Sequence, residues 1–325
     1  MYIIRNGLKK KWHWMAGVYC FFGVVASFGV GNATQINTVI TSVKTTFASL
    51  GLPQFKNIEL IVGGVLAIFI GIFLSGGGKR IYKTANALVP FAAFGYVLLC
   101  AFILVVRASK IPAAFSCIIQ GAFTPGAVTG GVVGSFFISL RTGASRGVFT
   151  NEAGMGTAGI AHCSAAVKHP VEQGLMGIVE VFIDTILICT LTALVILCSG
   201  TPIPFGEDPG IALTNGAFSK VCGPWIGVLI SVFLCLFAVA TVLGWGYYGG
   251  RCAQYIFGEN VWGKYVAAQV AVVLISAVLQ SKFLWTFSEL LNGLMALPNL
   301  LALLMLAPEI RKLLKEYLMD KARKT

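Results

Sequence analysis

A short polar segment interrupts apolar sequence between residues 147 and 158. It reads Gly-Val-Phe-Thr-Asn-Glu-Ala-Gly-Met-Gly-Thr-Ala, and apolar helical patterns flank it on both sides. Asn151 and Glu152 supply a carboxamide and a carboxylate, while Gly154 and Gly156 destabilise a helix interior and expose its backbone. Backbone that is not hydrogen-bonded at membrane depth is tolerated only where protein buries it or where it lines a cavity. The segment therefore predicts the break of a discontinuous helix.

Ion binding by peptide dipoles is the chemistry expected at such a break. Carbonyl groups that end the first half-helix would face a cation, and N–H groups that open the second half would face an anion. An amino acid accompanied by a sodium ion presents both charges. A glycine-rich cytoplasmic loop with a solvated Glu152 explains the same residues, and spacing alone does not separate these two interpretations.

The composition indicates a membrane protein. Of the 325 residues, 57% are hydrophobic and only 11% are charged, whereas soluble domains carry about 25% charged residues. We expect an all-α polytopic membrane helix bundle that forms a single transmembrane domain over residues 1–325, because no long polar linker divides the chain. A membrane span needs about 20 mainly apolar residues. This rule predicts about eight spans, near Trp14–Gly31, Glu59–Ser75, Ala85–Val106, Gly126–Phe149 (continuing past the break), Leu175–Leu197, Trp225–Tyr248, Tyr265–Leu279 and Leu284–Leu306.

The distribution of basic residues predicts the orientation. With a cytoplasmic N-terminus and alternating spans, sixteen of the 24 Lys and Arg residues fall in cytoplasmic segments. Six fall outside, and two, Arg141 and Arg146, have no clear depth; the six are Lys44, Lys56, Arg107, Lys110, Lys220 and Lys282. The positive-inside bias then places both termini in the cytoplasm of a multi-pass inner-membrane protein. The basic tails would touch anionic lipid headgroups.

Other polar residues lie inside the expected spans. Glu180 and Asp184 are four residues apart, which places both on one helix face. They could carry protons, pair with a basic residue such as Arg146, or anchor the broken backbone, and we favour the structural anchor. Asn32 and Gln35 also share a face, and they could line an outer vestibule or serve as interfacial polar caps. Thr241 and Trp245 share a face as well. They could supply a sodium ligand and an apolar wall, or the threonine could bond its own helix while the tryptophan lies in the interfacial belt.

Several function classes find no support in the sequence. No catalytic constellation is present, so the chain is not expected to be an enzyme. The three histidines and nine cysteines lack metal-ligand spacing, and no cofactor is predicted. A nucleic-acid partner is not expected, because no soluble basic domain carries the lysines.

The segment RGVFTNEAGMGTAGIAHCSAAVKHPVEQGLMGIVEVFIDTI resembles the alanine or glycine:cation symporter family, which includes the bacterial sodium:alanine symporters. The resemblance runs nearly from end to end and includes ASFGVGN at 26–32, LGWGYY at 243–248 and LMALPNL at 294–300. It implies a LeuT-type inverted-repeat fold in which substrate lies between two broken helices. The fold would be incomplete here, because the family's first broken helix, within three N-terminal spans, lies upstream of the methionine that matches Met1.

The resemblance also implies the site and its ligands. Substrate contacts would come from Phe28, Asn32, Asn151, Glu152, Gly154, Met155, Gly156, Thr157 and Trp245, and Thr241 would serve a sodium site. The implied function is sodium-coupled symport of a small neutral amino acid, alanine or glycine, with Na⁺ as the coupling ion. The alternative is a truncated, transport-inactive membrane fragment of such a symporter. The choice of Na⁺ or H⁺, the exact amino acid, the oligomeric state and the roles of Glu180 and Asp184 stay open.

Overall fold

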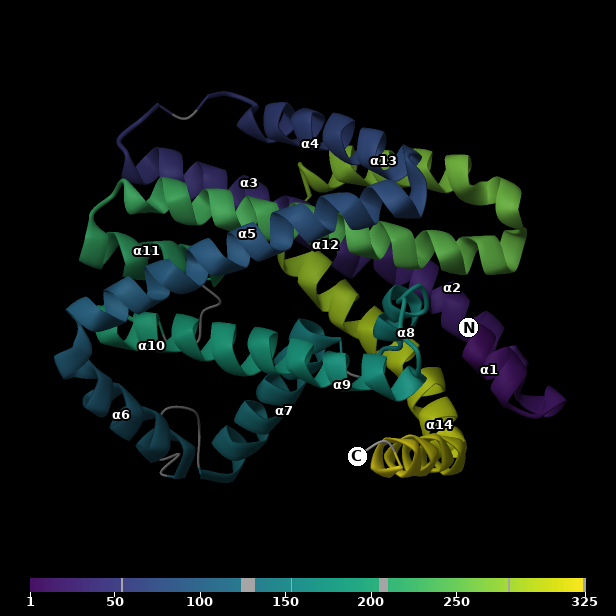
Figure 1. Cartoon of the computed structure of the whole chain (residues 1–325). Coiled ribbons are helices and arrows are strands. Elements are labelled where there is room, and N and C mark those ends of the chain that lie inside the picture. Colours follow the sequence, from purple (N-terminus) through teal and green to yellow (C-terminus); the bar gives the residue numbers. More distant parts are fainter. Residues whose placement is uncertain (54, 124–131, 153, 205–209, 280, 324–325) are drawn as a thin grey trace.

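The computed structural model describes residues 1–53, 55–123, 132–152, 154–204, 210–279 and 281–323, and within these ranges the chain is built from helices without a β-strand. Figure 1 shows their arrangement. The α-helices are α1 (Tyr2–Gly7), α2 (Trp14–Phe28), α3 (Thr34–Ser49), α4 (Ile58–Ser75), α5 (Gly77–Val106), α6 (Ile111–Phe123), α7 (Val132–Asn151), α8 (Thr157–His162), α9 (Pro170–Val181), α10 (Cys189–Ser199), α11 (Gly210–Cys222), α12 (Ile226–Phe257), α13 (Trp262–Ser276) and α14 (Ser281–Ala322).

Six helical segments among the described residues are long and apolar enough to cross a membrane. They are Lys10–Ser49, Ile58–Ser75, Gly77–Val106, Pro170–Ser199, Ile226–Phe257 and Trp285–Ala322. The expected all-α membrane bundle is confirmed at this level. The number eight stays a prediction, because the expected fourth span starts within residues 124–131, outside the described ranges, and α13, where the seventh was expected, is only 15 residues long.

The first span is longer than the sequence predicts. We expected this span to end near Gly31, but α2 and α3 form one continuous rod through the π-helix η2 (Gly29–Ala33). The Thr34 hydroxyl donates to the Val30 carbonyl at 2.7 Å, which satisfies a polar side chain inside the rod. Polar residues at 32–35 therefore do not end the helix, since their hydrogen bonds are made locally or to neighbouring helices.

Helix α12 lies at the centre of the bundle and packs against α2, α3 and α5 (Figure 1). Half of its most apolar stretch is buried, compared with 17% for the segment Pro170–Ser199. Small residues let neighbours approach closely. A Cβ on Gly246 would lie 2.7 Å from the Leu74 side chain of α4, and one on Gly250 would overlap the Trp262 ring of α13. The glycines of α12 thus bring adjacent helices to the short separation that the centre of the bundle needs.

The outer helices expose large apolar side chains. Ile68, Phe94, Val105 and Ile178 are each between 66% and 76% exposed. Apolar surface of this extent marks an interaction surface. On helices long enough to span a bilayer, lipid hydrocarbon chains would cover it.

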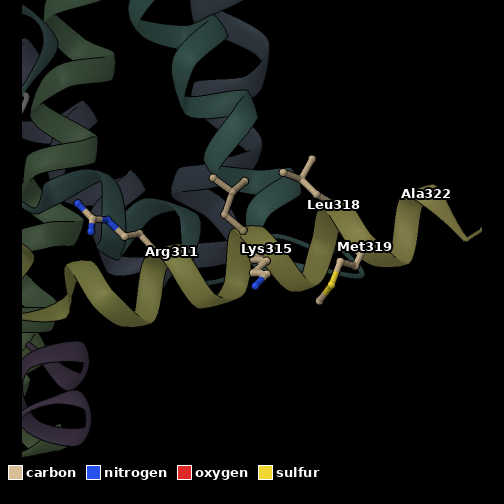
Figure 2. A pocket seen from close by; sticks show the side chains of 6 residues that line it. Arg311, Lys315, Leu318, Met319 and Ala322 are labelled. Carbon is tan, nitrogen blue, oxygen red and sulfur yellow. The ribbon is translucent and has the colours of Figure 1, made fainter.

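Helix α14 ends in a basic amphipathic stretch beyond Pro308. Figure 2 shows a shallow hollow along its last turns, and its lining is Arg311, Leu314, Lys315, Leu318, Met319 and Ala322. All six residues belong to this one helix. We assign this hollow no ligand, because no second element closes it.

Candidate functional site

The break that the sequence predicts is present between α7 and α8. Helix α7 ends at Asn151 and α8 begins at Thr157. Glu152, Gly154 and Gly156 all have left-handed backbone, with φ of 52°, 77° and 82°. The Met155 N–H donates to the Glu152 carbonyl at 3.0 Å and closes a turn. Glycine adopts this conformation without steric cost, which explains how the sequence Gly-Met-Gly ends one helix and starts another.

The rear of the break rests on helix α14. The Asn299 side-chain amide donates to the Gly154 carbonyl at 2.8 Å. A Cβ on Gly156 would lie 2.6 Å from Asn299 Oδ1, and one on Gly154 would lie 2.8 Å from the Leu300 side chain. Both glycines are therefore required by close packing as well as by their φ angles.

A cavity of about 740 Å³ opens on the other side of the break, between α5, α9, the π-helix η4 (Phe182–Ile188) and α12. This volume lies within the range of small-molecule pockets. Apolar residues such as Val89 and Phe237 form part of its wall. Its polar lining residues are Thr150, Asn151, Glu152, His162, Gln173, Glu180, Asp184, Thr241, Trp245 and Tyr248.

Four of the predicted site residues line this cavity: Asn151, Glu152, Thr241 and Trp245. They come from α7, the break and α12, so the fold brings together positions about 90 residues apart. The Glu152 side chain faces Thr157 and Trp245. The carboxylate at the break and the indole on α12 therefore belong to one site.

The other six predicted residues are not on the cavity lining. Met155 is fully buried and packs in a cluster with Tyr19 and Met295. Thr157 is also fully buried. Gly154 and Gly156 meet α14, as described above. The remaining two, Phe28 and Asn32, lie at a different helix contact.

Asn32 belongs to a buried hydrogen-bond network between α2 and α13. Its amide donates to the Gln269 carbonyl at 3.0 Å and to Gln269 Oε1 at 2.5 Å. Gln269 in turn donates to the Ser27 hydroxyl at 3.1 Å and to the Tyr265 hydroxyl at 2.6 Å. The Phe28 ring lies 5.6 Å, centroid to centroid, from the Tyr265 ring. In this conformation both residues join helices and are not on the cavity lining.

Thr241 and Trp245 form part of the α12 wall. The Thr241 hydroxyl donates to the Phe237 carbonyl of its own helix at 2.9 Å, which is the ordinary arrangement for an intramembrane threonine. Its oxygen keeps acceptor capacity toward the cavity. Trp245 is only 2% exposed, and a Cβ on Gly31 would overlap its side chain. The π-helix η2 therefore presses directly on the rear of this tryptophan.

Sequence reasoning missed the partner of Glu180. His162, at the end of α8, lies 3.1 Å from the Glu180 carboxylate, so the pair joins the second half of the broken helix to α9. Arg146, which we considered for this role, lies 3.1 Å from Glu289 instead. His162 and Glu180 belong to different helices, and no local spacing signal connects them.

The polar lining gives the cavity an acidic character. Glu152, Glu180 and Asp184 are carboxylates, and the lining within the described residues includes His162 but neither Lys nor Arg. A cleft with carboxylates and low-dielectric walls attracts cations. Asp184 lies in η4, and π-helical turns occur frequently at functional sites. The arrangement can hold a small polar molecule beside a cation.

Comparison with known proteins identifies a matching family and several relatives. A model of the sodium:alanine symporter family matches residues 1–325. An uncharacterized transporter from Haemophilus influenzae is 37% identical over 98% of this chain and 68% of its own length. The sodium/alanine symporter AgcS of Methanococcus maripaludis is 37% identical over 94% of this chain and 66% of its own.

A relative with a different named substrate lies somewhat further away. The probable sodium/glutamine symporter GlnT of Bacillus subtilis is 31% identical over 98% of this chain and 64% of its own length. The chain thus spans about two thirds of the length of these relatives. The family is one of transporters rather than enzymes. The long apolar helices among the described residues of this chain are those of an integral membrane protein. With a family match over its whole length and a helix broken beside an acidic cavity, the chain belongs to the sodium:alanine symporter family.

Proposed function

We propose that this chain acts in sodium-coupled symport of a small neutral amino acid, alanine or glycine, across the cytoplasmic membrane. One observation carries the proposal: the break between α7 and α8 adjoins a cavity of about 740 Å³ with carboxylates on its wall. The peptide dipoles at a helix break and an acidic side chain suit a zwitterion and a cation together. The family supplies the expectation of sodium and alanine.

The roles follow from position on the cavity wall. Asn151 and the backbone at Glu152 would contact the amino acid, and Trp245 would provide an apolar wall with an N–H donor. The Thr241 hydroxyl would be one sodium ligand, because sodium is a hard cation that prefers oxygen. Met155, Thr157, Gly154 and Gly156 would shape the break from behind.

Orientation and fold type belong to the same proposal. We infer that both termini are cytoplasmic, from the positive-inside bias, and that the helices belong to a LeuT-type inverted-repeat fold. Lipid headgroups would contact the basic ends of the chain.

Uptake into liposomes tests the proposal. The purified chain is reconstituted, and labelled alanine is offered with an inward sodium gradient or with potassium in its place. We expect sodium to raise the initial rate at least about tenfold, with unlabelled glycine and alanine competing better than glutamine. Equal uptake with potassium would contradict sodium coupling. Stronger competition by glutamine would instead assign a larger substrate.

The alternative is a transport-inactive membrane fragment, and it predicts no uptake above empty liposomes under either gradient. A separate binding measurement on the purified chain completes the test. Alanine binding in the presence of sodium, without uptake after reconstitution, would select this alternative.

A further inference from the structure

Helix α14 supplies a polar side chain to the rear of the break. Asn299 lies 145 residues from Gly154 along the chain, yet its Nδ2 donates to the Gly154 carbonyl at 2.8 Å. This is a contact between the fold's last helix and the segment that lines the cavity. We propose that Asn299 is a positioning residue, which fixes the geometry of the break so that Glu152 and Asn151 stay on the cavity wall.

The first argument is hydrogen-bond accounting. Breaking a helix frees carbonyl and N–H groups, which the surrounding protein or a cavity must satisfy at membrane depth. Within the described part of the break, the Met155 N–H bonds to the Glu152 carbonyl, and the Gly154 carbonyl bonds to Asn299. The Asn299 bond holds the Gly154 carbonyl toward α14, and neither Gly154 nor Asn299 lines the cavity. It therefore sets which face the peptide groups of the break present to a ligand.

The second argument is the fit around the amide. A Cβ on Gly156 would lie 2.6 Å from Asn299 Oδ1 and 3.0 Å from the Tyr19 hydroxyl. The amide thus lies across the two glycines whose left-handed backbone forms the break, while Tyr19 closes the space beside it. An asparagine in this place has a donor for Gly154 and is short enough to let the chain approach.

The third argument concerns how Asn299 would influence substrate binding. Asn299 does not line the cavity, so it acts through the break and not by touching the amino acid. Loss of its donor should change the conformation of residues 152–162 and, through them, the affinity for substrate. This last step rests on the proposed function, whereas the conformational step does not.

Hydrogen–deuterium exchange of the purified full chain tests the conformational step. Asn299→Leu removes the donor at similar volume, and Asn299→Ala removes it without any risk of a clash. Asn292→Leu is the matched control, because Asn292 is a buried asparagine on the same helix and its Oδ1 has no hydrogen-bond partner among the described residues. We expect amides of residues 154–162 to exchange about tenfold faster in both Asn299 variants, as loss of one buried hydrogen bond predicts, and to change less than about twofold in Asn292→Leu.

Alanine uptake by the same proteins tests the functional step. We expect the KM for alanine to rise about tenfold in Asn299→Ala while the maximal rate changes less, because a displaced break weakens binding first. Unchanged exchange in both Asn299 variants, or an equal change in Asn292→Leu, would overturn the positioning role. Faster exchange with no sodium-dependent uptake even by the unaltered chain would contradict the proposed function and leave the conformational role intact.

Discussion

Glu152 is the residue of the break whose backbone conformation is costly. Its φ of 52° lies in the left-handed region, which disfavours a non-glycine residue by roughly 1–2 kcal/mol. Such residues persist where the surroundings hold them, and they concentrate at functional sites. Here the side chain faces Trp245 and Thr157. The carboxylate is thus held on the cavity wall by a conformation that glycine would adopt more easily.

Gly31 controls the opposite wall of the site. A Cβ at this position would overlap the Trp245 side chain, and overpacking of this kind costs about 1–3 kcal/mol. We predict that Gly31→Ala displaces Trp245 into the cavity, lowers the unfolding midpoint in detergent and raises the KM for alanine severalfold. Thermal unfolding and uptake measure the two effects.

The control for Gly31 lies on the same rod. Gly17 in α2 has open space where its Cβ would be, so Gly17→Ala should preserve uptake and gain up to about 1 kcal/mol from helix propensity. Equal kinetics for the two variants would show that Trp245 has room to move and that Gly31 does not set its position.

At the scale of elements, local sequence predicted the helices and the break but not what holds the break. Glycines at 154 and 156 carry a local signal, since glycine adopts left-handed backbone without steric cost. Asn299 and His162 carry none, because each acquires its role from a helix distant in sequence. The π-helices η2 and η4 were also missed, because a single i→i+5 turn inside a longer helix leaves no simple residue pattern.

The contact between α8 and α9 allows a test of whether Glu180 is a structural anchor or an ion ligand. The side chain of Glu180 in the His162 pair is 66% exposed, and exposed pairs contribute about 0–1 kcal/mol. We predict that Glu180→Gln lowers the free energy of unfolding by less than about 1 kcal/mol and leaves the sodium dependence of uptake unchanged. Titration of the uptake rate with sodium, together with denaturant unfolding, measures both.

Glu172→Gln provides the comparison on the same helix, since Glu172 accepts a hydrogen bond from the Lys168 backbone at 3.2 Å and does not line the cavity. If Glu180→Gln shifted the sodium midpoint while Glu172→Gln did not, Glu180 would be a cation ligand rather than an anchor.

At the scale of the whole molecule, the charge distribution and the order of the helices together predict how the chain is oriented in the membrane. Lys56 lies between α3 and α4, and Lys79 lies at the start of α5, so the single helix α4 separates them. Lys56 and Lys79 are both exposed. With a cytoplasmic N-terminus, Lys56 lies outside the cell and Lys79 lies inside, where most Lys and Arg residues also fall.

Two lysine-to-cysteine variants test this orientation in a background without the nine native cysteines. We predict that a membrane-impermeant maleimide labels Lys56→Cys in intact cells, whereas Lys79→Cys reacts only after the membrane is opened. Each variant removes one of the 24 basic residues, so the overall charge bias that orients the chain is retained. Labelling of Lys79→Cys alone in intact cells would invert the topology and place the acidic cavity's His162 end outside. Labelling of both would mean that α4 does not cross the membrane, although it is 18 residues long and apolar.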